Sequence, residues 1–292
     1  MDNGQKATEK TFLKLLRGLR SIYGNAGRKI LLQAMAYIKP YEKDGKRKHE
    51  QYTQGKLSES DYRYWIQCQV FRGEKWENNV KSMLITLLDS SKSALNLIRT
   101  GQLDVFSDNG NYIAREISRT AKIGISFELF DRATVERLMK DKPQLLPKKV
   151  VNAEKQTLFD ERHIRNAIAQ GVILGDSIPD IAKRIATDSA NIDLNTATRY
   201  ARTAMTSAQN AGRIENMRRA EAMGIRIQKQ WLSAHDSRVR DAHIDLDGQI
   251  KDIDEPFDSM LGEIDFPGDP AADPANVWNC RCCLTYHYPD YD

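Results

Sequence analysis

The chain has 292 residues, of which 40% are hydrophobic and 29% are charged, and its formal net charge at pH 7 is +4. This length allows two domains of ordinary size, or one domain with a helical extension. No stretch approaches the roughly 18 uninterrupted apolar residues of a membrane span, and the first residues lack the apolar core of a secretion signal. The composition therefore excludes a membrane-spanning or secreted class and predicts a soluble protein made in a cytoplasm.

The two ends of the chain differ in charge. Residues 1–50 carry 12 Lys and Arg against 5 Asp and Glu, a net charge of +7, whereas residues 226–292 carry 6 against 14, a net charge of −8. This separation indicates different neighbours for the two ends. The alternative is that solvated surface residues happen to segregate by sign along the chain.

Helical periodicity dominates the beginning of the chain. Apolar residues recur at three and four positions over residues 11–40, with an interruption near residues 23–25. The following segment, residues 41–56, is polar, charged and almost without aliphatic side chains, and it predicts an exposed linker or arm.

Capping residues mark the beginnings of further helices. Ser58 and Asp61 have the spacing of a helix N-cap, and the apolar stripe that follows predicts a long helix that ends near Gly101. Residues 155–169 are helical in pattern. At Ser177 a capping residue, a proline and an acid predict another, short helix that continues to about residue 185.

The periodicity changes at Gly224. The longest predicted helix covers about residues 195–223, and Gly224 stands where a left-handed residue ends a helix. Residues 225–232 then alternate between apolar and polar, which predicts a strand that pairs with a second strand at residues 249–253. The remaining tail is rich in Asp, Pro and Gly, so its turns are too closely spaced for long helices.

The sequence therefore predicts an α+β protein, with a mostly helical N-terminal body and a small, irregular α+β C-terminal module. We expect a basic helical region with its linker at 1–56, a helical region at 57–154, a further helical part at 155–224 and the small module at 225–292. The domain boundary is placed near Gly224 because the period changes there.

Residues 231–282 are the most informative part of the sequence. Asp236, Arg240 and His243 fall at spacings of four and three, which predicts that the three side chains share one face of a helical turn. An Asp-Gly turn, a Pro-Gly-Asp corner that returns the chain and an Asn-Cys-Arg-Cys segment follow in this order.

This ordered set resembles the C-terminal module of the phage Mu F-like minor head proteins. The residues that carry the resemblance are Trp231, Asp236, Arg240, His243, Asp247, Gly248, Phe257, Pro267, Gly268, Asp269, Asn279, Cys280, Arg281 and Cys282. The preceding helix resembles the helix that leads into the module in this family, through Tyr200, Arg202, Thr203, Asn210 and Arg213. It departs from the family at Ala204, where an acidic residue often stands. The resemblance covers about residues 155–285, and half of the chain lies outside it.

The resemblance implies a structural component of a virion rather than an enzyme. It implies a minor capsid or head morphogenesis protein of a tailed phage or prophage, with a few copies near the portal that act in head assembly, DNA packaging or ejection. The implied partners are the portal protein and the major capsid or scaffolding protein. The implied location is the host cytoplasm during assembly and then the phage head.

The C-terminal module also contains residue types that bind zinc. His243, Cys280 and Cys282 are such residues, and Asp236 or His287 could complete four-coordination. A bound metal would stabilise a small module that has little aliphatic content. We therefore expect these side chains to converge on one site.

Two alternatives to zinc use the same residues. In the first, Asp236 pairs with Arg240, His243 bonds to backbone, and the cysteines are small buried apolar side chains. In the second, a disulfide forms in the mature virion, most easily between Cys280 and Cys283. The Cys-x-Cys spacing is tighter than that of zinc knuckles, which weakens the indication of zinc.

Two other classes of function remain open from the sequence. Lys46, Arg47 and Lys48 could contact packaged DNA, together with basic residues of the first helix, although no recognition motif accompanies them. A metal-dependent nuclease is the least favoured hypothesis, because the sequence lacks a phosphate-binding loop and the common hydrolase motifs. Its carboxylates would be Asp236, Asp241, Asp245 and Asp247.

Overall fold

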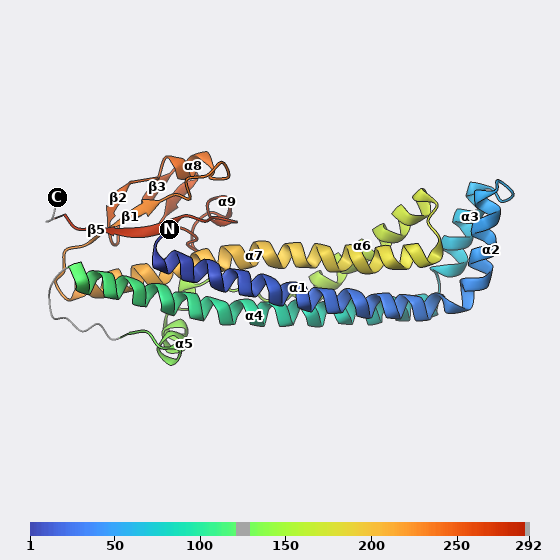
Figure 1. The fold of residues 1–292 in the computed structure, drawn as a ribbon, viewed down its shortest axis with the longest axis horizontal. Coiled ribbons are helices and arrows are strands. Elements are labelled where there is room, and N and C mark those ends of the chain that lie inside the picture. Colours follow the sequence, from blue (N-terminus) through green and yellow to red (C-terminus); the bar gives the residue numbers. More distant parts are fainter. Residues whose placement is uncertain (121–128, 290–292) are drawn as a thin grey trace. The chain divides into compact units, whose positions relative to one another are not determined.

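Figure 1 shows the computed structural model of the chain, which describes residues 1–120 and 129–289. The helices are α1 (Asn3–Ile38), α2 (Glu42–Thr53), α3 (Glu59–Trp65), α4 (Glu74–Thr120), α5 (Arg132–Asp141), α6 (Ala153–Leu174), α7 (Ile178–Ala222), α8 (Asp241–Ile244) and α9 (Pro274–Val277). Short helical turns are η1 (Lys39–Tyr41), η2 (Ile66–Val70) and η3 (Pro143–Leu145). The strands are β1 (Gln228–Leu232), β2 (Ile250–Asp252), β3 (Phe257–Ser259), β4 (Gly262–Ile264) and β5 (Cys283–His287). A helical body followed by a small module of short strands confirms the predicted α+β class.

The chain forms two compact units that each draw on distant parts of the sequence. Unit 1 contains Met1–Arg17, Asn96–Lys149 and Thr198–Asp292, and unit 2 contains Gly18–Leu95 and Val150–Ala197. Helices α1, α4 and α7 contribute residues to both units. The units therefore divide the chain differently from the expected boundaries, because the end of α7 and the module that follows it belong to one unit. No helix in the described ranges is long and apolar enough to cross a membrane.

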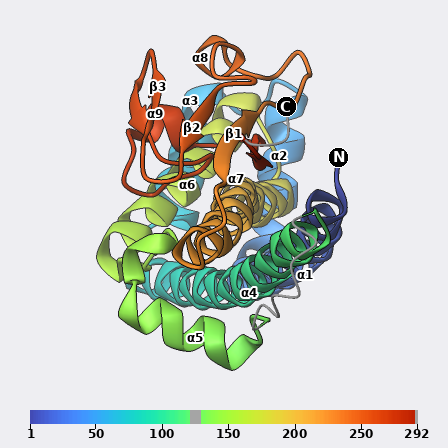
Figure 2. The ribbon, with the colours of Figure 1, turned by 90° about the vertical axis from the view of Figure 1, so that its left-hand side faces the viewer.

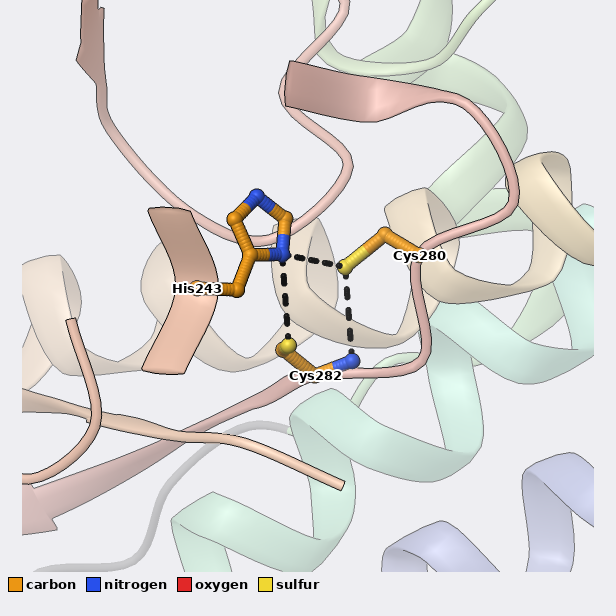
Figure 3. A group of neighbouring side chains, drawn as sticks. All are labelled: His243, Cys280 and Cys282. Atoms are coloured by element: carbon orange, nitrogen blue, oxygen red, sulfur yellow. Dashed lines mark hydrogen bonds between the residues drawn. The ribbon is translucent and has the colours of Figure 1, made fainter. Parts of the chain in front are cut away.

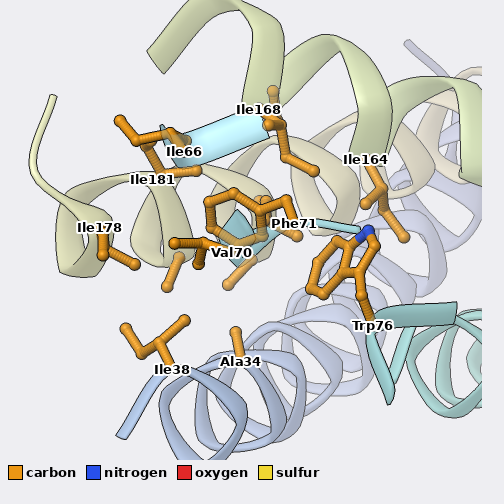
Figure 4. Close-up of a cluster of buried hydrophobic side chains, with 14 of the residues drawn as sticks. Ala34, Ile38, Ile66, Val70, Phe71, Trp76, Ile164, Ile168, Ile178 and Ile181 are labelled. Carbon is orange, nitrogen blue, oxygen red and sulfur yellow. The ribbon is translucent and has the colours of Figure 1, made fainter. Parts of the chain in front are cut away.

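Unit 2 has an apolar core to which helices α1, α4, α6 and α7 and the turn η2 all contribute (Figure 4). Ile38, Val70, Ile168 and Ile181 are buried in it. Trp76 closes one side of this core, where its ring meets that of Phe71 edge-on, with centroids 4.9 Å apart. The apolar stripe that begins near Trp76 is thus a packing surface.

The predicted linker at residues 41–56 is instead helix α2. Gly45 is buried, and a Cβ there would lie 2.6 Å from the Cδ1 atom of Ile178. The ring of Tyr52 stacks on that of Tyr62 with centroids 4.7 Å apart. The helix is held by a glycine and by aromatic contacts rather than by an aliphatic stripe, so the hydrophobic pattern of the segment does not reveal it.

Three predicted helix breaks are also wrong. Helix α1 is continuous through residues 23–25, and α4 continues past Gly101. A Cβ at Gly101 would lie 2.9 Å from Leu15, so this glycine allows close packing instead of ending the helix. The two helices predicted at about 178–185 and 195–223 are the single helix α7, because polar residues between them, such as Ser189, are buried and not part of a loop.

A buried pair of carboxyl groups joins α6 and α7 inside unit 2. The Gln156 amide donates to the Oδ1 atoms of Asp160 and Asp193 at 2.9 and 3.3 Å. Both aspartates are buried. Burial, followed by the charge of Asp193, raises the pKa of Asp160 to about 8. Asp160 therefore keeps its proton in the folded protein at neutral pH.

This pair predicts a pH dependence of stability. The unfolded pKa of an aspartate is about 4, so between about pH 4 and pH 8 the folded protein binds more protons than the unfolded chain. The free energy of unfolding must therefore fall as the pH rises through this window, by roughly 1 kcal/mol per pH unit. Asp160→Asn should remove most of this slope in urea unfolding at pH 5–8. Glu154→Gln, at an exposed position in the first turn of α6, should leave the slope in place.

The strands of unit 1 form a three-stranded sheet with the order β2-β1-β5 and a separate β3-β4 hairpin. Strand β1 pairs antiparallel with β2, with Gln228 opposite Asp252, which confirms the two strands predicted after Gly224. Strand β5 was not expected, because its sequence does not alternate between apolar and polar side chains. In Figures 1 and 2, β1 and β2 lie beside the C-terminal part of α7, and α5 lies on the other side of α4.

Candidate functional site

The second half of α7 carries a row of buried polar side chains. They are Thr203, Thr206, Ser207, Gln209, Asn210, Arg213, Glu215 and Asn216. A polar group that loses its contact with water costs free energy unless it finds a hydrogen-bond partner. Many partners of this row are backbone atoms of the C-terminal module, so α7 positions that module directly.

Asn210 binds two separate segments of the module. Its Nδ2 donates to the Pro267 carbonyl at 2.9 Å, and its Oδ1 accepts from the Leu284 backbone N–H at 2.8 Å. One turn earlier, the Thr206 hydroxyl donates to the Cys280 carbonyl at 2.6 Å. These bonds fix the path of the chain as it approaches and enters β5.

Arg213 is fully buried and joins three segments of unit 1. Its guanidinium donates to the Leu284 carbonyl at 2.8 Å, to the Asn109 Oδ1 atom at 3.0 Å, and to both carboxylate oxygens of Asp2 at 2.8 Å. Burial alone would raise the pKa of Asp2, but the hydrogen bond and charge of Arg213 outweigh it and the pKa is lowered. Arg213 thereby connects the start of α1, helix α4 and strand β5.

The Pro-Gly-Asp corner lies directly on α7. Gly268 has a φ of 84°, and a Cβ there would lie 2.8 Å from the backbone nitrogen of Ser207. Only glycine suits both the left-handed backbone and this close approach. Asp269 closes the corner, because its carboxylate accepts from the backbone N–H groups of Ala271 at 2.8 Å and Asp265 at 3.2 Å.

Trp231 is the centre of the small core in the module. Its side chain is fully buried, and its ring meets those of His243 and Phe257 edge-on, with centroids 5.1 and 5.3 Å away. The Asp-Gly turn supports the same strand: Asp247 accepts from the Ser233 backbone N–H at 2.6 Å, and Gly248 follows with a φ of 81°.

A histidine and two cysteines meet beside this core (Figure 3). The Nδ1 atom of His243 in α8 lies 3.6 Å from the Cys280 Sγ and 3.5 Å from the Cys282 Sγ. All three side chains are buried, and their ligand atoms lie within 4.8 Å of one another. The convergence predicted from the sequence is confirmed, and these residues could hold a metal ion.

The two thiols of this cluster interact with each other. A hydrogen bond with the Cys282 thiol lowers the pKa of Cys280, and the charge of Arg240 acts in the same direction. The same hydrogen bond, together with burial, raises the pKa of Cys282.

Asp236 does not join this cluster, and the predicted helical face of Asp236, Arg240 and His243 is wrong. Helix α8 begins only after Arg240, which has an extended backbone. Asp236 instead binds the Arg281 guanidinium, with 2.7 Å between Oδ1 and Nη2, and this bond lowers its pKa. Arg240 donates to the carbonyls of Ala275 and Trp278.

His287 lies away from the cluster as well. It pairs with Gln228 across the sheet, five residues beyond Cys282 on an extended strand, which corresponds to about 17 Å. The Cys283 thiol donates to the Leu284 carbonyl at 3.0 Å. Within residues 1–120 and 129–289, only His243, Cys280 and Cys282 form a group with metal-binding spacing, so the four aspartates considered for a nuclease do not converge.

The basic residues proposed for DNA contact lie on α2 in unit 2. Lys46 and Arg47 are exposed, and Arg47 pairs with Asp44 at 2.9 Å. Lys48 is half-buried, with its Nζ 5.6 Å from the centre of the Trp65 ring. Arg47 and Lys48 therefore already contact other side chains of this chain.

Sequence reasoning missed Asn276, which supports the histidine. Asn276 is fully buried in α9, and its Oδ1 lies 2.9 Å from the Nε2 atom of His243. A single asparagine in a polar tail has no periodicity and no motif spacing that would reveal such a contact.

Comparison with known proteins identifies the region that contains this site. Residues 162–285 match the family model described as Phage Mu protein F like protein. The chain carries a Mu F-like region. This confirms the resemblance over nearly the same residues, and the region contains both the buried polar face of α7 and the histidine–cysteine cluster.

One curated relative supports the same assignment. The chain is 33% identical over 144 residues to a protein described as minor head protein GP7 of Bacillus phage SPP1. The similar part covers 49% of this chain and 46% of that protein, so the chain spans about half the length of its relative. No solved structure matches the chain.

Proposed function

We propose that the chain is a minor head protein of a tailed phage or prophage, a structural component rather than an enzyme. The match of residues 162–285 to the Mu F-like family carries this proposal, and the relative named minor head protein supports it. The matched residues include those that bind the C-terminal module to α7, namely Asn210, Arg213 and Gly268. These buried contacts stabilise the module against α7.

We place the protein in a few copies near the portal, where it acts in head assembly, DNA packaging or ejection. Its partners are then the portal protein and the major capsid or scaffolding protein. This protein is incorporated during assembly in the host cytoplasm and afterwards is part of the phage head. This finer assignment rests on the family resemblance.

Crosslinking inside purified particles tests the placement. Lysine-reactive crosslinking and mass spectrometry should connect this chain to the portal protein, because a portal-proximal subunit has that protein within reach of its side chains. Crosslinks from this chain to tail proteins alone would contradict the proposal. Particles assembled without the portal gene serve as the control, and they should lose both the crosslinks and most of the chain.

Contact with packaged DNA is the second candidate function, favoured by the exposed Lys46 and Arg47 on α2. If these residues neutralise phosphates, replacing Lys46, Arg47 and Lys48 with glutamine should weaken DNA binding and reduce its salt slope by up to about three. The measurement is binding to duplex DNA over a range of salt concentrations.

A variant with the same change in net charge controls for the long-range electrostatic effect. Arg132, Arg137 and Lys140 are exposed on α5 and can be replaced in the same way. Equal slopes in the two variants and the parent would exclude a specific role of α2 in DNA binding.

A further inference from the structure

We propose that His243, Cys280 and Cys282 bind one zinc ion that ties α8 to the segment between α9 and β5. The distances suit this ion. With Zn–S near 2.3 Å and Zn–N near 2.0–2.1 Å, a sulfur and a nitrogen ligand of a tetrahedral site lie roughly 3.6 Å apart. The two Sγ–Nδ1 distances are 3.6 and 3.5 Å.

The tautomer of His243 also suits a metal ligand. The Asn276 Nδ2 donates to the Gly262 carbonyl at 3.1 Å, so its Oδ1 is the atom that faces the Nε2 of His243 at 2.9 Å. Nε2 must therefore carry the proton, and Nδ1 directs its lone pair toward the two sulfurs. One zinc ion between these three atoms would bind the nitrogen and both sulfurs together.

Groups around the cluster support thiolate ligands. The backbone N–H of Cys282 donates to the Cys280 Sγ at 3.4 Å. The Ser259 hydroxyl donates to Asn276 Oδ1 at 3.3 Å and so fixes the amide that orients the histidine. Ligating histidines are commonly held by such a second contact on their other ring nitrogen. The three protein ligands leave one position of the tetrahedron for a water molecule.

A zinc ion here has a clear structural purpose. Residues 233–282 contain only short helices and strands, with few aliphatic side chains. Metal ligation can supply folding free energy that such a small core lacks. The ligands come from α8 and from two positions about 40 residues later, so the ion would close this part of the module like a crosslink.

The first test measures metal in the full chain, purified under reducing conditions from zinc-supplemented cells. We expect about one zinc per chain by elemental analysis. After exchange to Co²⁺, the protein should show thiolate-to-cobalt charge-transfer absorption and the visible bands of a tetrahedral cobalt site. Chelation should raise hydrogen exchange in α8 and β5 before it does so in unit 2.

Cysteine variants locate the ion. Cys280→Ser and Cys282→Ser should each lose the charge-transfer absorption and most of the zinc. Cys283→Ser is the matched control, because Cys283 is equally buried and adjacent but its thiol donates to the Leu284 carbonyl. It should retain both the absorption and the metal.

Asn276→Ala keeps all three ligands and tests the site if the cysteine variants do not fold. Loss of the orienting amide should weaken zinc affinity by about 10–100-fold in competition with a chromophoric chelator. A chain that takes up neither Zn²⁺ nor Co²⁺ under reducing conditions would overturn the proposal. Equal metal binding by the parent, Cys280→Ser and Cys282→Ser would also overturn it, since the ion would then lie elsewhere.

Discussion

Arg213→Ala is expected to lower the free energy of unfolding by about 3–5 kcal/mol, the cost of removing one partner from a buried ion pair. The variant would leave the Leu284 carbonyl, the Asn109 amide oxygen and the half-buried Asp2 carboxylate without the guanidinium that binds them. Unpaired buried polar groups each retain their full desolvation cost. Chemical denaturation monitored by circular dichroism provides the measurement.

Two controls separate the buried network from general effects of removing an arginine. Arg199→Ala, at an exposed position on the same helix, should change stability by less than about 0.5 kcal/mol. Asp2→Ala combined with Arg213→Ala should cost less than the sum of the single changes, because the two groups bind each other. A loss below about 1 kcal/mol for Arg213→Ala would contradict the role assigned to it.

Trp231→Ala should be comparably severe, with a loss of about 3–5 kcal/mol from the cavity and the lost apolar burial. Trp231 is fully buried and packs against His243 and Phe257, so its removal would also loosen the support of the histidine–cysteine cluster. Under the proposed zinc site, we therefore expect reduced zinc content together with reduced stability. Both are measured on the same purified protein.

Two other substitutions provide controls for the loss of stability expected from Trp231→Ala. Trp278 is 49% exposed, so Trp278→Ala should have a much smaller effect. Trp231→Phe retains an aromatic ring and forfeits no hydrogen bond, because the Trp231 Nε1 has no partner among the described residues. It should cost less than the alanine variant. Equal losses from Trp231→Ala and Trp278→Ala would show that the module does not depend on its buried tryptophan.

Much of the fold follows from the sequence because its regular patterns have local causes. The change of period after Gly224 correctly predicts that β1 follows the helix and pairs with β2. The helix lengths could not be predicted in the same way. Gly101 resembles a helix end, but its actual role is to let Leu15 approach closely, which depends on a partner far away in the sequence.

The candidate site was predictable to a similar degree. Residue types and order indicate that His243, Cys280 and Cys282 converge, and the structure brings them together. The spacing of Asp236 and Arg240 is equally suggestive, yet each binds a different part of the chain, because the segment before α8 is not helical. The contact of Asn276 with the histidine depends on tertiary structure alone.

The protein content of proheads tests the proposed function most directly. Proheads should be purified from cells that express this chain with the portal and major capsid proteins of its own phage, and from cells that lack only the portal gene. We predict that quantitative mass spectrometry finds a few copies per particle in the first preparation and a strong depletion in the second. Absence of the chain from portal-containing proheads would contradict the assignment as a minor head protein.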